Sequence, residues 1–286
     1  MKKIINLIVI GSNSFIASSF ISKIDKKKFN LIKLHKPEFD LFNIAKITKI
    51  FKKYKDSQNI IFFAAAIAPC KSYTDLYLNI KMVNNFIENF NSNNISHFYY
   101  LSSDAVFSDS KKRINEKFKK EPNNLHGLMH LIRENIIKSK FNHRMSAIRP
   151  TLVYGFGDKH NGYGPNKFIS SLKKGEDIYL FGKGEEIRDH IYINDIGTLI
   201  SLIINNGIKD DLNLVTGNDQ SFLNIATIIH KNFNNNHNKI IFSKRVQPMP
   251  HNGYRVFDNS KIFKFFPKFK FTKFNKSIKD YISQIS

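Results

Sequence analysis

Two histidines, His126 and His130, stand four residues apart in a segment whose pattern predicts a helix from about residue 124 to 138. Residues four apart share one face of a helix, so the two imidazole rings would point the same way. An imidazole titrates near pH ~6.5 and moves protons at neutral pH, which makes the pair candidate acid and base catalysts. Two histidines also suit a metal ion, but no third ligand stands at a suggestive spacing. We therefore predict no metal site.

A turn of small residues follows the first apolar run of the chain. Residues 4–10 are apolar, β-branched and few enough for a buried parallel strand, and helical spacing resumes after the turn, with Phe15, Ile16 and Phe20 on one face. Strand, tight turn and helix in this order are typical of a dinucleotide-binding unit, although a plain strand–helix corner has the same pattern. The predicted cofactor contacts of this turn are Gly11, Ser14, Phe15, Ile16 and Ala17.

The residue types in this turn fit the approach of a phosphate group only in part. A pyrophosphate must come close to backbone N–H groups at the start of a helix. Gly11 can form the tight turn, and Ala17 is small enough for close packing of helix on strand. Ser14 puts a side chain where the phosphate would approach, although its hydroxyl could donate to the phosphate instead.

Strand and helix patterns alternate through the first half of the chain. This alternation predicts an α/β fold with a doubly wound, Rossmann-like parallel sheet. The predicted strands after the first cover residues 30–34, 59–63, 97–101 and 145–148, and the predicted helices between them cover 44–54, 73–90 and about 124–138.

Candidate site residues stand where these predicted strands end. Gly11, Ala64, Ser103 and Pro150 all follow or close a strand, and the carboxyl ends of parallel strands meet at one edge of a sheet, where ligands bind. Ala64, Ala65 and Ala66 are small enough to let a cofactor pass. His35 and Lys36 end the second strand, where an enzyme that uses NAD often has an acidic residue, and this favours NADP.

The composition of the sequence changes after Pro150, because glycine becomes frequent and the predicted helices and strands become shorter. We predict a dinucleotide-binding domain over residues 1–155 and a smaller, partly interleaved substrate-binding region over 156–286, with residues from about 186 to 206 returning to the core. Within that returning segment, a short strand from residue 188 leads into a helix capped by Asn194 or Asp195.

Bulk composition narrows the class of protein. The chain has 286 residues and a formal net charge of +22, and no apolar run reaches the ~18 residues that span a bilayer. The single cysteine, Cys70, excludes an internal disulfide and fits the reducing cytoplasm. The lysines are spread rather than clustered and accompany abundant Asn, Ile and Phe, which indicates codon composition more than a nucleic-acid surface. We expect a cytoplasmic protein with no membrane partner.

Nearly the whole chain resembles the extended short-chain dehydrogenases/reductases, the NAD-dependent epimerase/dehydratase family. That family includes enzymes that epimerise, dehydrate or reduce nucleotide sugars. The motifs that carry the resemblance are GSNSFIA at 11–17, FDL at 39–41, FFAAA at 62–66, SSDAVF at 102–107, RPTLVYG at 149–155, GKGEEIRDHIYINDI at 182–196 and FDNSK at 257–261.

The resemblance implies a role for most of these positions. It implies NAD or NADP as cofactor, a nucleotide sugar as substrate, an adenine contact at Asp40 with Leu41 beside it in the cofactor site, and a nicotinamide neighbour at Pro150. It also implies that Ser103 hydrogen-bonds the reacting oxygen and that Arg188 binds the diphosphate. We add Asn166, Lys167 and Tyr192 as candidates for the wall of the substrate site.

The sequence departs from the family at the catalytic centre, where the family has a tyrosine and, four residues later, a lysine. His126 and His130 occupy these positions. Either His126 acts as acid and base, with Asp104 as a second proton carrier and His130 at the ribose, or the site has lost its chemistry and the histidines remain in a vacated pocket.

Three hypotheses for the function follow. The chain is an NAD(P)-dependent oxidoreductase acting on a nucleotide sugar, or a non-catalytic binding relative of such enzymes. An RNA-binding protein ranks after both and is suggested by the net charge. The family also implies a homodimer formed through a bundle of helices that includes the His126 helix.

Overall fold

The computed structural model describes residues 5–89, 94–233 and 237–285, and the chain forms two compact units. The first unit comprises Met1–Ser108, Glu116–Pro150 and Gly197–Asn213, and the second comprises Asp109–Asn115, Thr151–Ile196 and Leu214–Ser286. This division into units does not test the predicted domain boundary after residue 155, which stays a prediction. Among the described residues, no helix has both the length and the apolar character needed to cross a membrane.

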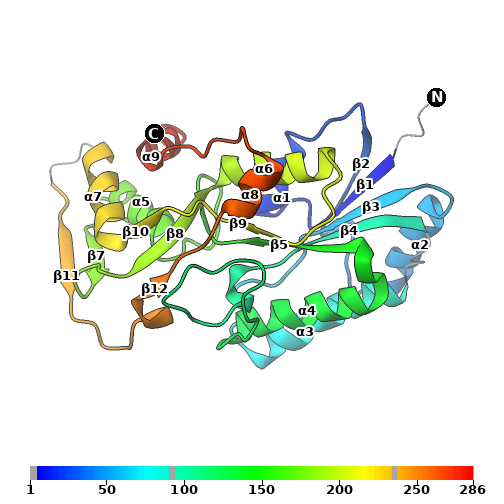
Figure 1. The fold of residues 1–286 in the computed structure, drawn as a ribbon, viewed down its shortest axis with the longest axis horizontal. Helices are drawn as coiled ribbons and strands as arrows, with labels where there is room; N and C mark the ends of the chain where they lie inside the picture. The colour runs from blue at the N-terminus through cyan, green and yellow to red at the C-terminus, as the bar shows by residue number, and fades with distance from the viewer. Residues whose placement is uncertain (1–4, 90–93, 234–236, 286) are drawn as a thin grey trace. The chain divides into compact units, whose positions relative to one another are not determined.

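The first unit is built on a six-stranded sheet in the order β2-β1-β3-β4-β5-β9, and the pairs from β2 to β5 are parallel (Figure 1). Every residue of β3 is buried, as expected for a strand covered on both faces. The doubly wound parallel sheet is therefore confirmed. The strands are β1 (Ile5–Ile10), β2 (Phe29–Leu34), β3 (Asn59–Phe63), β4 (Ile95–Leu101), β5 (Met145–Pro150) and β9 (Leu212–Leu214).

Helices cover both faces of this sheet. In Figure 1, α3 and α4 lie below it and α1 and α6 above it. Side chains cap four of these helices: Ser14 caps α1, Asn43 caps α2, Ser72 and Asp75 form a capping box on α3, and Asn124 caps α4. The helices are α1 (Phe15–Ile21), α2 (Ile44–Tyr54), α3 (Tyr73–Glu88), α4 (Leu125–Phe141) and α6 (Ile193–Asn205), with the 3₁₀ turns η2 (Asp104–Val106) and η3 (Asn142–Arg144).

In helix α1, Phe20 is buried and Phe15 and Ile16 are half-buried, beside the buried Ala17 and Ile21. The predicted cap of α6 was wrong. Helix α6 begins at Ile193, so Asn194 and Asp195 lie in its first turn rather than at its cap. The predicted strand residue Ile4 and helix residue Phe90 lie outside the described residues.

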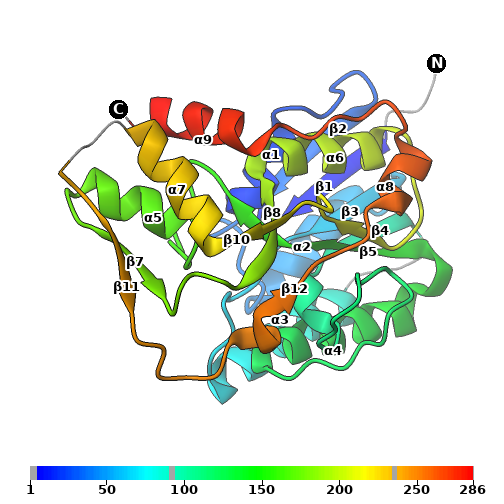
Figure 2. The same ribbon diagram turned by 60° about the vertical axis from the view of Figure 1, so that its left-hand side comes forward.

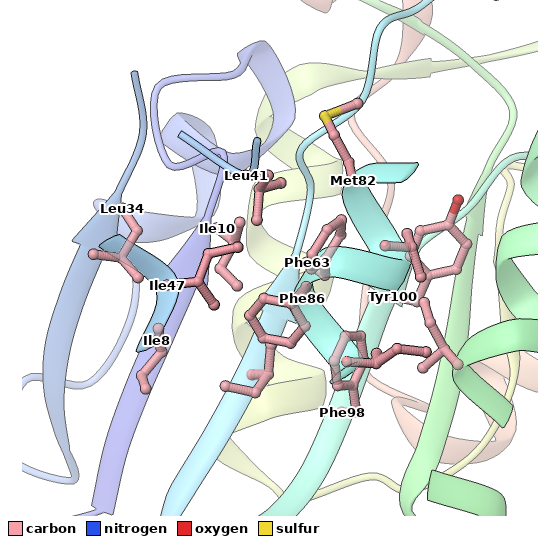
Figure 3. Close-up of a cluster of buried hydrophobic side chains, with 14 of the residues drawn as sticks. Ile8, Ile10, Leu34, Leu41, Ile47, Phe63, Met82, Phe86, Phe98 and Tyr100 are labelled. Atoms are coloured by element: carbon pink, nitrogen blue, oxygen red, sulfur yellow. The ribbon is translucent and has the colours of Figure 1, made fainter. Parts of the chain in front are cut away.

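A cluster of aliphatic and aromatic side chains fills the space between the sheet and helices α2, α3 and α4 (Figure 3). Ile8 and Ile10 of β1 meet Ile47 of α2, and the rings of Phe63 and Phe86 pack edge to face with centroids 5.2 Å apart. This packing fixes the carboxyl ends of β1, β3 and β4, where the candidate site residues stand.

The second unit is centred on β8 (Ile187–Tyr192), which pairs with three strands (Figure 2). The rest of the unit is a two-stranded parallel pair, β7 with β11, and short helices. Its other elements are β6 (Leu152–Tyr154), α5 (Pro165–Lys173), β7 (Ile178–Phe181), β10 (Asp219–Ser221), α7 (Phe222–Phe233), β11 (Ile240–Ser243), η4 (Pro250–Gly253), β12 (Tyr254–Arg255), α8 (Ser260–Phe265) and α9 (Phe274–Ser283).

Candidate active site

The turn after β1 touches the end of β3 through Gly11. Gly11 has a φ of +79°, and a Cβ atom at this position would lie 2.7 Å from the backbone nitrogen of Ala65. Any other residue would therefore be strained in the turn and would also collide with the neighbouring backbone. The N–H groups of Gly11 and Ser12 both donate to the carbonyl of Leu34, at 2.8 and 3.2 Å. Gly11 thus joins the ends of three strands at one edge of the sheet.

Ser14 caps helix α1. Its hydroxyl oxygen accepts a hydrogen bond from the N–H of Ala17 at 3.4 Å, and its own backbone is extended. The serine therefore serves the helix itself, which explains locally why a residue other than glycine stands here. Ala17 is fully buried against the core, as its small size predicted.

The residues after β2 are engaged with one another. The hydroxyl of Ser12 lies 2.8 Å from Nδ1 of His35, and the Lys36 ammonium lies 3.3 Å from the Asp40 carboxylate. Burial raises the pKa of Asp40, but the hydrogen bond from the Phe42 N–H and the charge of Lys36 outweigh it, so the pKa lies below its ordinary value. Leu41, next to Asp40, is buried. The positive charge at this strand end is thus partly balanced by Asp40.

The remaining strand ends lie at the same edge. The N–H of Ala64 donates to the carbonyl of Ile10 at 2.8 Å, Ala66 is exposed, and Pro150 is the buried last residue of β5. Because β1, β3, β4 and β5 run parallel and side by side, Gly11, Ala64, Ser103 and Pro150 do share one edge.

Ser103 and Asp104 form a short turn beyond β4. The Ser103 hydroxyl accepts from the N–H of Ala105 at 3.2 Å and donates to the Asp104 carboxylate at 3.3 Å. Both side chains are half-buried. Helix α4 comes very close to this turn at Gly127, where a Cβ atom would lie 2.1 Å from the carbonyl oxygen of Ala105. The glycine therefore lets the histidine helix pack directly on the serine turn.

His126 and His130 are in contact but differ in their surroundings. Their ring centroids are 4.7 Å apart and the rings are nearly perpendicular. His126 is half-buried, and its Nδ1 accepts a hydrogen bond from the N–H of Cys70 at 3.4 Å. His130 is buried, and its Nδ1 lies 2.7 Å from the hydroxyl oxygen of Tyr100. Burial is the main cause that holds the pKa of His130 well below its ordinary value, and the positive charge of Arg133 acts in the same direction.

The candidate substrate residues of the second unit are, apart from Lys167, engaged in local contacts. Arg188 is buried, pairs with Glu186 at 2.8 Å and donates to the carbonyl of Pro250 at 2.7 Å. The Asn166 amide bridges the loop at 155–158, because it accepts from the Gly155 N–H at 3.0 Å and donates to the Asp158 carboxylate at 2.7 Å.

Lys167 is exposed, whereas Tyr192 is buried and lines a cavity of about 210 Å³ within the second unit. Burial also raises the pKa of Tyr192. Across the described parts of both units, no group of three or more His, Cys, Asp or Glu side chains is arranged to hold a metal ion.

Comparison with known proteins settles the family. A sequence model of the NAD dependent epimerase/dehydratase family matches residues 7–214. The chain belongs to this family. It is 23% identical over 231 residues to a GDP-6-deoxy-D-talose 4-dehydrogenase from Aggregatibacter actinomycetemcomitans, with 78% of each chain covered.

Two further comparisons extend this result. The chain is 22% identical over 218 residues to an N-acetyl-alpha-D-glucosaminyl-diphospho-ditrans,octacis-undecaprenol 4-epimerase from Escherichia coli O157:H7, covering 70% of this chain and 63% of that protein. Among solved structures, a UDP-N-acetylglucosamine 4-epimerase from Methanobrevibacter ruminantium M1, in complex with UDP-N-acetylmuramic acid, matches with a TM-score of 0.82 at 21% identity, covering 99% and 98% of the two chains. This match confirms the fold.

Within this member of the family, a cluster of buried charged side chains lies behind the site. Glu134 of α4 accepts from the Ser102 hydroxyl at 2.6 Å and from Arg149 at 2.7 and 2.8 Å, and Arg149 also reaches Asp211 at 2.8 Å. The cluster ties helix α4 to β4 and β5 at the residues that precede Ser103 and Pro150.

Two residues of this region were missed in the sequence, Tyr100 and Arg133. Tyr100 is a fully buried strand residue, and Arg133 is fully buried on α4 with its guanidinium donating to the carbonyl of Ala65 at 2.6 Å. The helical spacing offered a signal, because Arg133 falls on the same face as the buried residues Met129, His130 and Ile137.

Proposed function

We propose that the chain is an NAD(P)-dependent enzyme that oxidises or reduces a secondary alcohol carbon of a nucleotide-activated sugar, as part of an epimerase, dehydratase or reductase reaction. The observation that supports this most directly is the packing of α4 on the Ser103 turn, with Gly127 against Ala105, at the sheet edge that Gly11 and Ala65 also form. Membership of the family and the nucleotide-sugar enzymes among its relatives support the choice of substrate class.

The residues at the sheet edge fit a dinucleotide. Gly11 brings the backbone of the first turn against the end of β3, and the neighbouring Ala64, Ala65 and Ala66 carry only methyl side chains. The cofactor, when bound, accepts or returns a hydride at its nicotinamide ring. The residues that would hold it are Gly11, Ser14, Phe15, Ile16, Ala17, His35, Lys36, Asp40, Leu41, Ala64, Ala65, Ala66 and Pro150.

The protein's own groups would handle the proton and the oxygen. When a sugar hydroxyl is oxidised, its carbon loses a hydride and its oxygen loses a proton, which a protein group must accept. Ser103 would hydrogen-bond that oxygen, with His126 at the position of the family's tyrosine and Asp104 as a proton carrier. His130, which was predicted to contact the ribose, is buried against Tyr100, and we propose instead that it orients His126.

The second unit would recognise the rest of the substrate. Arg188 would bind the diphosphate, provided that it exchanges its contact with Glu186 for the phosphate oxygens. Asn166, Lys167 and Tyr192 would contribute to the sugar or nucleotide contacts.

A cofactor titration followed by a substrate screen tests the proposal. Quenching or enhancement of NADH or NADPH fluorescence should saturate at micromolar concentration, and a panel of nucleotide sugars should then yield turnover. Ser103→Ala and His126→Ala should each lower turnover by ~10²-fold or more. His143→Ala and Ser139→Ala, which change exposed residues at and just beyond the far end of α4, serve as controls. Unchanged turnover in both active-site variants would refute the assignment.

A non-catalytic relative is the second candidate, favoured by the loss of both the family tyrosine and the family lysine and by the burial of His130. Such a protein would bind the cofactor or the nucleotide sugar but turn over neither. Turnover with any nucleotide sugar excludes it.

A further inference from the structure

The loop between β3 and α3, residues 64–72, is held by side chains of two helices. Asn79 of α3 clamps Ile67, accepting from its N–H and donating to its carbonyl, each at 2.9 Å. Arg133 of α4 donates to the carbonyl of Ala65 at 2.6 Å and to Asn79 at 3.3 Å. Neither Asn79 nor Arg133 is exposed to solvent. Since both clamps come from buried side chains on packed helices, the loop has a fixed path.

The far end of the loop is fixed by the start of α3. The Asp75 carboxylate accepts from the N–H groups of Lys71 and Ser72, both at 3.0 Å, and the Ser72 hydroxyl accepts from the N–H of Asp75 at 3.1 Å. Cys70 therefore lies between two anchored points. The backbone N–H of Cys70 can only donate a hydrogen bond, and it is directed at Nδ1 of His126.

This donor determines which nitrogen of His126 carries the proton. A neutral imidazole has one N–H and one lone pair, so a ring whose Nδ1 accepts a hydrogen bond must carry its hydrogen on Nε2. An imidazolium would carry a second hydrogen on Nδ1 and would turn that hydrogen against the Cys70 N–H. His126 also lies in the first turn of α4, where the helix dipole disfavours a positive charge.

We propose, building on the proposed function, that His126 acts as a neutral Nε2–H donor to the reacting sugar oxygen and does not itself transfer the proton. The proton passes instead from the sugar hydroxyl to the Ser103 oxygen while the Ser103 hydrogen moves to the Asp104 carboxylate, along the 3.3 Å hydrogen bond between them. In the same step the sugar carbon would give its hydride to the nicotinamide ring of the proposed cofactor, which serves as the oxidant, so that atoms and charge balance.

The groups packed around the ring agree with a neutral His126. His130 is itself kept neutral, because burial lowers its pKa, and Arg133 adds a positive charge nearby. The titratable and charged groups on the surrounding elements include His130, Arg133 and Glu134 on α4, Tyr100 on β4, Asp104 on η2, Cys70 in the loop and Asp75 in the first turn of α3.

Nitrogen NMR on protein labelled at its histidines tests the tautomer without any substrate. The His126 signals, assigned by their loss in His126→Gln, should show a bare Nδ1 and a protonated Nε2. This pattern should persist to about pH 6, where the same ring in urea-unfolded protein is largely protonated. A ring that carries its hydrogen on Nδ1, or that is largely protonated at about pH 6, overturns the proposal.

Two substitutions test the role in catalysis. The glutamine of His126→Gln can donate an N–H hydrogen bond but cannot act as acid or base. The phenyl ring of His126→Phe can do neither. Loss of one donor to a reacting oxygen costs ~10²–10³-fold in kcat, so the Phe variant should fall by that factor and the Gln variant should stay within ~10-fold of the native rate. Equal inactivity of the two variants, with cofactor binding retained, overturns the proposal.

The two experiments keep this inference separate from the proposed function. If the chain binds no cofactor and turns over no nucleotide sugar, the proposed function fails while the NMR result still decides the tautomer. If turnover is found and His126 titrates as an ordinary base, the function stands and the inference fails.

Discussion

Replacing Gly127 by alanine is the sharpest test of how helix α4 is placed. In the interior of a helix this change normally stabilises a protein by up to ~1 kcal/mol. Here the added Cβ would lie 2.1 Å from the Ala105 carbonyl oxygen and 2.7 Å from Cβ of Pro122, whereas real Cβ atoms essentially never approach closer than 3.0 Å. The helix and the serine turn must therefore separate by about 0.9 Å, the difference between 3.0 and 2.1 Å.

The size of the effect follows from that displacement. Overpacking a well-packed contact costs ~1–3 kcal/mol, against the ~1 kcal/mol gained in helix propensity. The displacement of about 0.9 Å places the overpacking cost in the upper part of that range, at ~2–3 kcal/mol, so we expect a net loss of about 1–2 kcal/mol in the free energy of unfolding. We also expect a fall of ~10²-fold in turnover, because a 1 Å misplacement between Ser103 and His126 spoils the reacting geometry.

Urea unfolding followed by circular dichroism measures the first effect, and turnover of the nucleotide sugar found in the screen measures the second. Gly162→Ala is the matched control, because a Cβ atom there meets nothing within 4 Å and the φ angle of Gly162 lies outside the left-handed region. If Gly127→Ala is as stable as the native chain or more stable, α4 does not press on the Ala105 carbonyl and the account of the site is wrong.

Three further outcomes are expected. Glu134→Ala should cost ~3–5 kcal/mol in urea unfolding, because it leaves the buried Arg149 guanidinium without its main partner; a loss below ~1 kcal/mol would contradict this. Gly11→Ala should abolish cofactor binding in the fluorescence titration, since its Cβ meets the Ala65 backbone at 2.7 Å; unchanged affinity would count against the cofactor turn. His190 is buried, neither ring nitrogen has a hydrogen-bond partner among the described residues, and burial lowers its pKa to about 3. Below pH ~6.5, His190 binds a proton in the unfolded chain but stays neutral in the folded chain. The free energy of unfolding should therefore fall from pH ~6.5 towards 3 by up to ~1.4 kcal/mol per pH unit. His190→Leu should remove that part of the slope in unfolding measured across this range, and an unchanged slope would refute the assignment.

Much of the fold could be predicted because burial leaves a periodic trace in the sequence. Helix 44–54 and strand 59–63 were predicted with the bounds they have, since Ile47 and Phe51 mark one helix face and the strand is apolar throughout. The start of α6 was predicted wrongly. Asn194 and Asp195 are residue types that often cap helices, but here they lie one and two residues after the start of a helix that continues directly from β8.

The candidate site was predictable in its strand ends and not in its electrostatics. Gly11, Ala64, Ser103 and Pro150 follow from the rule that parallel strands end at one edge. The separation of His126 from His130 does not follow from their spacing, because four residues place them on one face but cannot say that Cys70 meets one ring and Tyr100 the other.

The sequence by itself determined the alternation of strands and helices, the parallel sheet, the glycine turn and the family. These depend on local pattern and on residues near one another in the chain. Only the tertiary structure decided that Gly127 rests on Ala105, that Arg133 and Asn79 hold the loop before Cys70, and that Glu134 lies between Ser102 and Arg149. These contacts join residues from 12 to 68 positions apart. Hydrogen bonds and close packing at such separations are set by the three-dimensional path of the chain and leave no periodic signal.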